Sequence, residues 1–159
     1  MERKTKVLAE DGKPDILITR EFDLPVELLF KAYTEPGLLE QWMGTKVLKL
    51  DNKPLGAYAF ETSDGQGNIL FKAHGAIHDM VANQKIVRTF EMENAGFDVQ
   101  LEFLQFEQLT PDTSKLTIQT IFRSEAHRAK QLKMPFAYGI NMAHDRLQEI
   151  IHASGANKQ

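Results

Sequence analysis

The region from Thr45 to Phe122 is a succession of short segments rich in apolar and β-branched residues, separated by turns. The turns are DNKP, SDGQGN, VANQ, ENAG and TPDTS, which contain the Gly, Pro, Asn and Asp residues that turns favour. Turns of this length join antiparallel neighbours, so the region predicts an antiparallel sheet. We expect its strands at 45–51, 55–62, 69–81, 85–93, 97–109 and 114–123.

Two short helices are expected before these strands, after a first strand at about 16–22. Pro25 and Pro36 each suit the first turn of a helix, where the missing N–H costs nothing. Apolar residues then recur at helical spacings: Val26, Leu29, Phe30 and Tyr33, followed by Leu38, Leu39 and Trp42. Gly44 is a natural left-handed stop. We expect the pair of helices to plug one end of the fold, with Trp42 and Met43 as an apolar seal.

The C-terminal region from Ala126 to Gly155 is predicted to be helical, with Pro135 starting its main segment. One apolar stripe along it consists of Phe136, Ile140, Ala143, Leu147, Ile150 and Ile151. Such a helix lies on a sheet, which gives an α+β arrangement. If about seven strands curve around the helix, a cavity can remain between the two.

Composition predicts one globular domain. The chain has 159 residues, of which 42% are hydrophobic and 26% charged, ordinary values for a folded domain. We expect residues 1–14 to form a loose terminus or an edge strand, 15–154 to form the domain, and 155–159 to form a flexible tail.

Several function classes are disfavoured by the residues that are present. A net charge of -3, with the charges scattered, gives no footprint for nucleic acid. The absence of cysteine excludes disulfides and thiolate chemistry. No stretch approaches the ~20 apolar residues that span a bilayer, and the N-terminus has no apolar signal-peptide core. We therefore expect a cytoplasmic protein without nucleic-acid binding or membrane insertion.

The segment REFDLPVELLFKAYTEPGLLEQWMG resembles the opening of the START-like (SRPBCC) superfamily. The similar branch contains the C-terminal domain of the activator of the heat-shock protein 90 ATPase. PLGAYAF, GAIHDMVANQKIVRTFE and FEQLTPDTSKLTIQT are similar, in order and spacing, to later strands of that branch. The likeness runs from about Ile16 to Ile151. It departs at Met43, where the family has a second tryptophan, and at Ile140, where the family has an aromatic residue.

The resemblance implies a helix-grip fold with a cavity under the C-terminal helix. Relatives bind lipids, sterols, polyketides or other apolar molecules, and some catalyse reactions inside the cavity. Members of this branch are also described as candidate co-chaperones, with a role in the stress response. The resemblance thus implies binding of a small apolar ligand. A module that acts on heat-shock protein 90 and a cavity enzyme of cyclase or hydrolase type are the alternatives.

Eight residues are predicted to contact the ligand: Trp42, Tyr58, Phe60, Arg88, Phe90, Phe136, Ile140 and His144. For the aromatic residues, ordinary core packing is the alternative. Phe136 and Ile140 are expected to face the cavity, because the first half of the long helix would span the open part of the grip. Leu147 and Ile151 would then pack tightly behind them. His144 lies at the edge of the stripe, from which it could reach the cavity.

Arg88 shares strand parity with the apolar residues Ile86, Phe90 and Met92, which places its guanidinium on the apolar face. A buried charge without a partner costs several kcal/mol. Arg88 therefore needs a carboxylate such as Glu102, a carboxylate on the ligand, or a path to water at the rim.

The sequence contains no recognised catalytic, cofactor or metal motif. His74 and His78 share a strand face but lie about 13 Å apart at roughly 3.3 Å per residue, too far to bind one metal ion. A Gly-x-Ser-x-Gly elbow and a phosphate loop are missing. Acid–base candidates form an ambiguous set, namely Arg88, Glu102, Tyr138 and His144. We expect a non-catalytic binder without metal or cofactor, and catalysis stays an open alternative.

Overall fold

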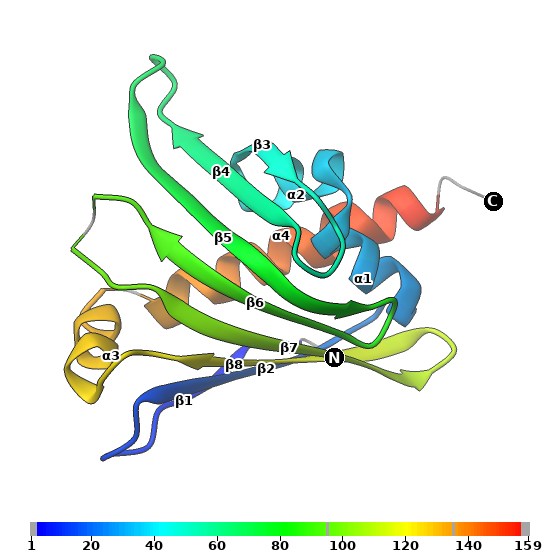
Figure 1. The fold of residues 1–159 in the computed structure, drawn as a ribbon. Coiled ribbons are helices and arrows are strands. Elements are labelled where there is room, and N and C mark those ends of the chain that lie inside the picture. Colours follow the sequence, from blue (N-terminus) through cyan, green and yellow to red (C-terminus); the bar gives the residue numbers. More distant parts are fainter. Residues whose placement is uncertain (1–2, 95, 135, 157–159) are drawn as a thin grey trace.

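One antiparallel sheet dominates the computed structural model, which describes residues 3–94, 96–134 and 136–156. The strands of this described part are β1 (Lys6–Leu8), β2 (Asp15–Phe22), β3 (Lys46–Leu50), β4 (Ala57–Ser63), β5 (Ile69–Val81), β6 (Lys85–Met92), β7 (Gln100–Thr110) and β8 (Thr113–Ile121). Their order across the sheet is β1-β2-β8-β7-β6-β5-β4-β3 (Figure 1). The seven predicted strands are confirmed, and the short β1 adds an eighth at the edge beside β2.

Four helices accompany the sheet in the described part of the chain: α1 (Val26–Thr34), α2 (Pro36–Met43), α3 (Glu125–Leu132) and α4 (Phe136–Ala156). The predicted pair of short helices is confirmed, and Gly44 ends the second in the left-handed conformation with φ 66°. The C-terminal region divides into two helices, with Ser124 capping α3 by accepting from the His127 amide. The predicted start at Pro135 lies outside the described residues, as do 157–159 of the predicted tail.

The sheet curves around α4, while α1 and α2 lie across one end of the groove (Figure 1). Register shifts in β5 and β7, between Ile77 and Asp79 and between Gln108 and Thr110, mark bulges, which bend strands. This arrangement is the α+β helix-grip architecture that the sequence predicts.

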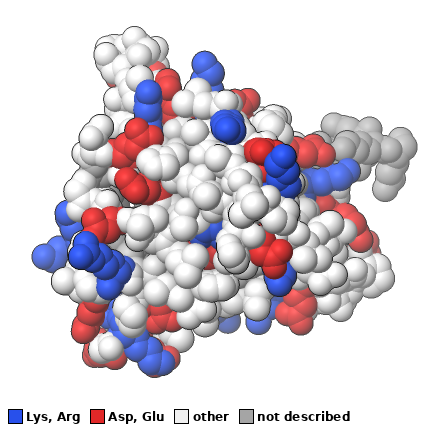
Figure 2. Space-filling view, in the orientation of Figure 1, with Lys and Arg blue, Asp and Glu red and all other residues white. Residues whose placement is uncertain are grey.

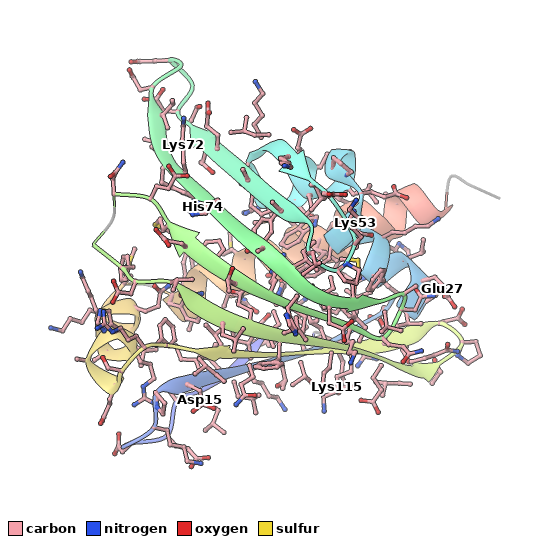
Figure 3. The ribbon with its side chains drawn as sticks, in the orientation of Figure 1. Asp15, Glu27, Lys53, Lys72, His74 and Lys115 are labelled. Atoms are coloured by element: carbon pink, nitrogen blue, oxygen red, sulfur yellow. The ribbon has the colours of Figure 1, made fainter. Side chains whose placement is uncertain are left out.

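Strict alternation gives the sheet a buried and an outer face. In β8 the residues at even numbers, Leu116 and Ile118 among them, are buried against the helices, as predicted. On β5, Lys72 and His74 project from the opposite face to Ala73 (Figure 3). The core therefore lies between the concave face and the helices.

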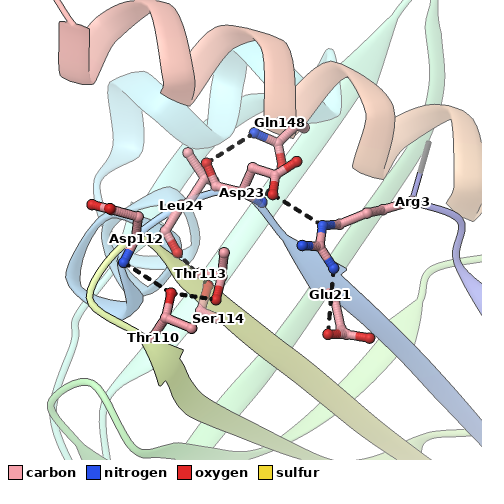
Figure 4. A network of polar contacts seen from close by, with 9 residues as sticks. All are labelled: Arg3, Glu21, Asp23, Leu24, Thr110, Asp112, Thr113, Ser114 and Gln148. Carbon is pink, nitrogen blue, oxygen red and sulfur yellow. Dashed lines mark hydrogen bonds and ion pairs between the residues drawn. The ribbon is translucent and has the colours of Figure 1, made fainter. Parts of the chain in front are cut away.

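The connection between β2 and α1 is fixed by polar contacts to two other elements (Figure 4). Ser114 of β8 donates its hydroxyl to the Leu24 carbonyl at 2.8 Å, and Gln148 of α4 accepts from the Asp23 amide at 2.8 Å. Arg3 pairs with the Asp23 carboxylate at 3.0 Å. These contacts set the position at which α1 and α2 enter the groove.

Candidate ligand-binding pocket

A pocket of about 270 Å³ lies between the first half of α4, the end of α2 and the concave face of the sheet. Twelve of its lining residues are apolar or aromatic: Ile18, Tyr33, Trp42, Met43, Phe60, Phe90, Met92, Ile118, Phe122, Phe136, Ile140 and Ala143. Five are polar: Arg88, Gln100, Glu102, Thr120 and Gln131. The pocket thus combines an apolar wall with a small polar region, the usual composition of small-molecule sites.

Six of the eight predicted contact residues line this pocket, namely Trp42, Phe60, Arg88, Phe90, Phe136 and Ile140. They come from α2, β4, β6 and α4, so the fold brings together side chains that are far apart in the sequence. Tyr58 and His144 are not among the lining residues. Both instead support residues that do line it.

Trp42 forms part of the wall at the end of α2. Its indole Nε1 donates to the Ala32 carbonyl at 2.8 Å, and its ring centroid lies 5.1 Å from that of Tyr33. Because the one polar atom of the indole is satisfied inside the protein, the ring can present an apolar surface to the pocket.

Arg88 points into the concave face, as its parity predicts, and it is paired. Its Nε donates to Glu102 Oε1 at 2.9 Å, with the two side chains 13% and 12% exposed. Gln100 donates to the other oxygen of Glu102 at 3.2 Å. The carboxylate partner is therefore Glu102, one of the three alternatives that the sequence leaves open, and the charge is neutralised within the protein.

Tyr58 lies behind this ion pair rather than in the pocket wall. Its ring centroid is 5.1 Å from the Arg88 guanidinium carbon, and its hydroxyl donates to the Thr89 carbonyl. The tyrosine crosses Gly75 so closely that a Cβ there would lie 2.6 Å from the hydroxyl oxygen. A glycine is required at this position, and the buried Tyr58 holds Arg88 in place.

His144 is fully buried and is not among the residues that line the pocket. It lies in the core behind the pocket wall, although the sequence suggested that it could reach the cavity. Its Nδ1 lies 2.7 Å from the Thr5 hydroxyl oxygen and its Nε2 lies 3.3 Å from the Tyr33 hydroxyl oxygen. Burial, with a smaller effect from the Arg20 charge, lowers the pKa of His144 to about 3. The imidazole is therefore neutral at physiological pH and connects Thr5, just before β1, to the tyrosine of the pocket.

A sequence model of the family described as Activator of Hsp90 ATPase homolog 1-like protein (AHSA1) matches residues 23–152. The chain belongs to this family. None of the curated proteins compared with the chain matches it.

Solved structures of bacterial proteins share the AHSA1-like fold over nearly their whole length. Protein Ms6760 from Mycobacterium smegmatis is 18% identical, with a TM-score of 0.82 over 92% of this chain and 96% of that one. A protein from Arthrobacter aurescens is 17% identical, with a TM-score of 0.83 over 93% and 91%. A protein from Rhodobacter sphaeroides is 15% identical, with a TM-score of 0.84 over 94% and 99%. At these sequence identities, the similarity shows a shared fold and nothing more.

Both departures from the family pattern, Met43 and Ile140, lie in the wall of the pocket. Met43 and Ile140 therefore contribute a flexible methionine and a branched aliphatic side chain to the wall of the pocket.

The polar lining residues Glu102, Gln100 and Thr120 were not predicted as ligand contacts. Cross-strand register places Arg88 opposite Glu102, and Glu102 opposite Thr120, so that a polar row crosses β6, β7 and β8. Their inward parity was visible in the sequence, but their alignment depends on the register. Tyr33 was also missed, because its helical spacing with Phe30 indicates ordinary core packing.

The four acid–base candidates do not converge on one point. Arg88 and Glu102 face the pocket, His144 is in the core, and Tyr138 is 70% exposed on the outer side of α4. Within the described part of the chain, no group of three or more His, Cys, Asp or Glu side chains could hold a metal ion. His74, one of the two histidines considered above, pairs instead with Glu93 at 3.0 Å.

Basic and acidic side chains are intermingled over the face shown in Figure 2, with uncharged residues between them. This distribution gives no extended field of one sign on that face. None of the described helices is both long enough and apolar enough to cross a membrane.

Proposed function

We propose that this AHSA1-like protein binds a small, largely apolar molecule in the pocket beneath α4, without catalysing its conversion. The observation that carries the proposal is the pocket itself, whose apolar and aromatic wall surrounds one polar region. Its volume of about 270 Å³ is just below the roughly 300–1,000 Å³ common for ligand sites.

The volume also restricts the size of the ligand. At the packing density of protein interiors, it holds roughly 10 to 15 non-hydrogen atoms. This size suits a molecule of one or two rings better than a whole sterol or a long-chain lipid. Among the ligand classes that the family resemblance implies, a small aromatic or polyketide-like compound is therefore favoured.

The proposal is tested by an NMR titration with a panel of one- and two-ring apolar compounds. Binding should shift the Trp42 indole resonance and the Ile140 amide saturably, and each compound should be recovered unchanged after long incubation. If no compound of this size binds, the proposal is wrong. Conversion of a bound compound would instead favour the cavity-enzyme alternative.

Variants on α4 provide matched controls for that titration. Ile140→Asp places a charge in the pocket wall and should abolish binding, whereas Tyr138→Asp places the same charge on the exposed side of the same helix and should leave binding intact. Ala143→Phe should fill the pocket without introducing charge. If Ala143→Phe loses binding but keeps its fold, the loss is caused by filling of the pocket and not by unfolding.

The family description favours a second candidate, a co-chaperone that acts on heat-shock protein 90. It is tested by stimulation of the chaperone's ATPase and by co-elution with the chaperone. If the protein acts on the chaperone by docking through its surface, the effect should persist in Ala143→Phe, whose pocket is filled. That variant therefore distinguishes docking from ligand binding. If the protein neither stimulates the ATPase nor co-elutes with the chaperone, this candidate is excluded.

A further inference from the structure

The polar region of the pocket carries no net charge. Arg88 and Glu102 neutralise one another at 2.9 Å, and Gln100 satisfies the second oxygen of the carboxylate. A ligand carboxylate placed here would lose its hydration and approach Glu102, while the Arg88 charge that could attract it is already paired with that carboxylate. The geometry therefore favours an uncharged molecule.

A chain of hydrogen bonds leads from Arg20 through Thr5 and His144 to the Tyr33 hydroxyl. Arg20 Nη1 donates to the Thr5 hydroxyl oxygen at 3.4 Å, and the same oxygen lies 2.7 Å from His144 Nδ1. Arg20 Nη1 also donates to Asp145 Oδ1 at 2.7 Å and to Asn141 Oδ1 at 3.3 Å, so Thr5 is its most distant contact. The cation beside the Thr5 oxygen still favours the hydroxyl hydrogen pointing away from it, to Nδ1. A neutral imidazole that accepts at Nδ1 carries its own hydrogen on Nε2.

The direction of these hydrogen bonds determines whether the Tyr33 hydroxyl can donate its hydrogen to another group. His144 Nε2 then donates to the Tyr33 hydroxyl oxygen at 3.3 Å, so the hydrogen of that hydroxyl is not consumed by the histidine. Within the described residues, His144 is the one hydrogen-bond partner recorded for this hydroxyl. Burial raises the pKa of Tyr33, so the hydroxyl keeps its hydrogen.

Tyr33 lines the pocket together with Arg88 and Glu102. We propose that the pocket selects uncharged ring compounds that carry a carbonyl or ether oxygen, and that the Tyr33 hydroxyl donates a hydrogen bond to that oxygen. Thr5 and His144 act as positioning residues that orient the donor. This inference rests on the proposed function, and it names the chemical class of the ligand and a contact residue that the sequence did not reveal.

The tautomer of His144 tests the direction of the chain without any ligand. Ring nitrogen chemical shifts in the wild-type protein should show hydrogen on Nε2 and none on Nδ1. Thr5→Val removes the donor to Nδ1 while keeping a β-branched side chain, and the preference for that tautomer should then weaken. Hydrogen on Nδ1 in the wild-type protein would mean that Tyr33 donates to the histidine, and the inference would be overturned.

Three probes of nearly equal size test the selectivity: acetylnaphthalene, ethylnaphthalene and naphthoate, substituted at the same ring position. Wild-type protein should bind the ketone about five- to tenfold more tightly than the hydrocarbon, the usual effect of one net hydrogen bond. Naphthoate should bind most weakly. In Tyr33→Phe the ketone should lose its advantage, while ethylnaphthalene should bind as in the wild type, which also shows that the variant is folded.

The outcomes separate the inference from the proposal on which it rests. If wild-type protein binds none of the three probes, the proposed function fails and this inference with it. Equal affinity for ketone and hydrocarbon, or tightest binding of naphthoate, overturns the inference alone. Because these comparisons use the wild-type protein, they hold even if Tyr33→Phe fails to fold.

Discussion

The two halves of α4 carry the same apolar stripe but have different surroundings. In the second half, Leu147 and Ile151 are 0% and 1% exposed, where the helix packs on α1 and α2. In the first half, Phe136 and Ile140 are half-buried and border a hollow. An apolar stripe thus shows which face of a helix is turned inward, whereas the neighbouring helices decide whether the space beneath that face is filled.

Trp42 lies where the tightly packed region beneath the second half of α4 meets the pocket beneath the first half. Its truncation should have the largest effect on stability. Trp42→Ala should lower the free energy of unfolding by about 3 to 5 kcal/mol, because the indole is buried and hydrogen-bonded to Ala32. Chemical denaturation measures this loss. A change under about 1 kcal/mol would mean that the indole is exposed on the surface and not part of the core.

Truncation within α4 compares the two halves directly. Leu147→Ala should cost about 2 to 4 kcal/mol, because it leaves a void in a packed core, whereas Ile140→Ala should cost less than about 1.5 kcal/mol beside a space that already exists. Equal losses in parallel denaturation curves would show that the first half is packed as solidly as the second.

His144 makes stability depend on pH at the boundary between the halves. Unfolded histidine takes up a proton near 6.5, whereas the pKa of His144 in the fold is about 3. Protonation therefore favours the unfolded chain as the pH falls through this window. The free energy of unfolding should decrease by about 2 to 3 kcal/mol between about pH 6.5 and pH 4.5 from this residue.

Denaturation at several pH values checks this dependence against two variants. His144→Gln should remove the histidine's contribution to the slope, and His152→Gln, at an exposed position of the same helix, should leave it unchanged. An identical slope in wild type and His144→Gln would place the acid sensitivity elsewhere.

The smallest expected effect concerns the net charge of the pocket beneath the first half of α4. Glu102→Gln leaves the Arg88 guanidinium without its carboxylate, so the pocket becomes cationic. Naphthoate should then bind about five- to tenfold more tightly than to the wild type, which corresponds to about 1 to 1.4 kcal/mol. Calorimetric titration measures the change, with ethylnaphthalene as the uncharged control. Unchanged naphthoate affinity would place Arg88 out of reach of the ligand.

Much of the fold could be predicted because it follows from local patterns. Turn residues located the hairpins, Pro25 and Pro36 located the short helices, and strand parity placed Arg88 on the inner face. These features depend on residues close together in the chain, which is why one sequence suffices to find them.

The supporting contacts of the site could not be predicted in the same way. His144 is buried because Thr5, from a segment expected only as a loose terminus or edge strand, covers it across 139 positions of sequence. Tyr58 supports Arg88 only because Gly75 allows it to cross β5. Such relations arise from strand order and register, which local periodicity does not encode.

The proposed function requires that the sheet and the first half of α4 form a hollow that admits an apolar guest. A crystal of the protein under xenon pressure tests it most directly, since xenon enters apolar cavities. We expect a xenon atom in contact with Trp42, Phe60 and Ile140, and none beside Leu147 or Ile151. Side chains filling the space between Trp42 and Ile140, with no xenon there, would contradict it.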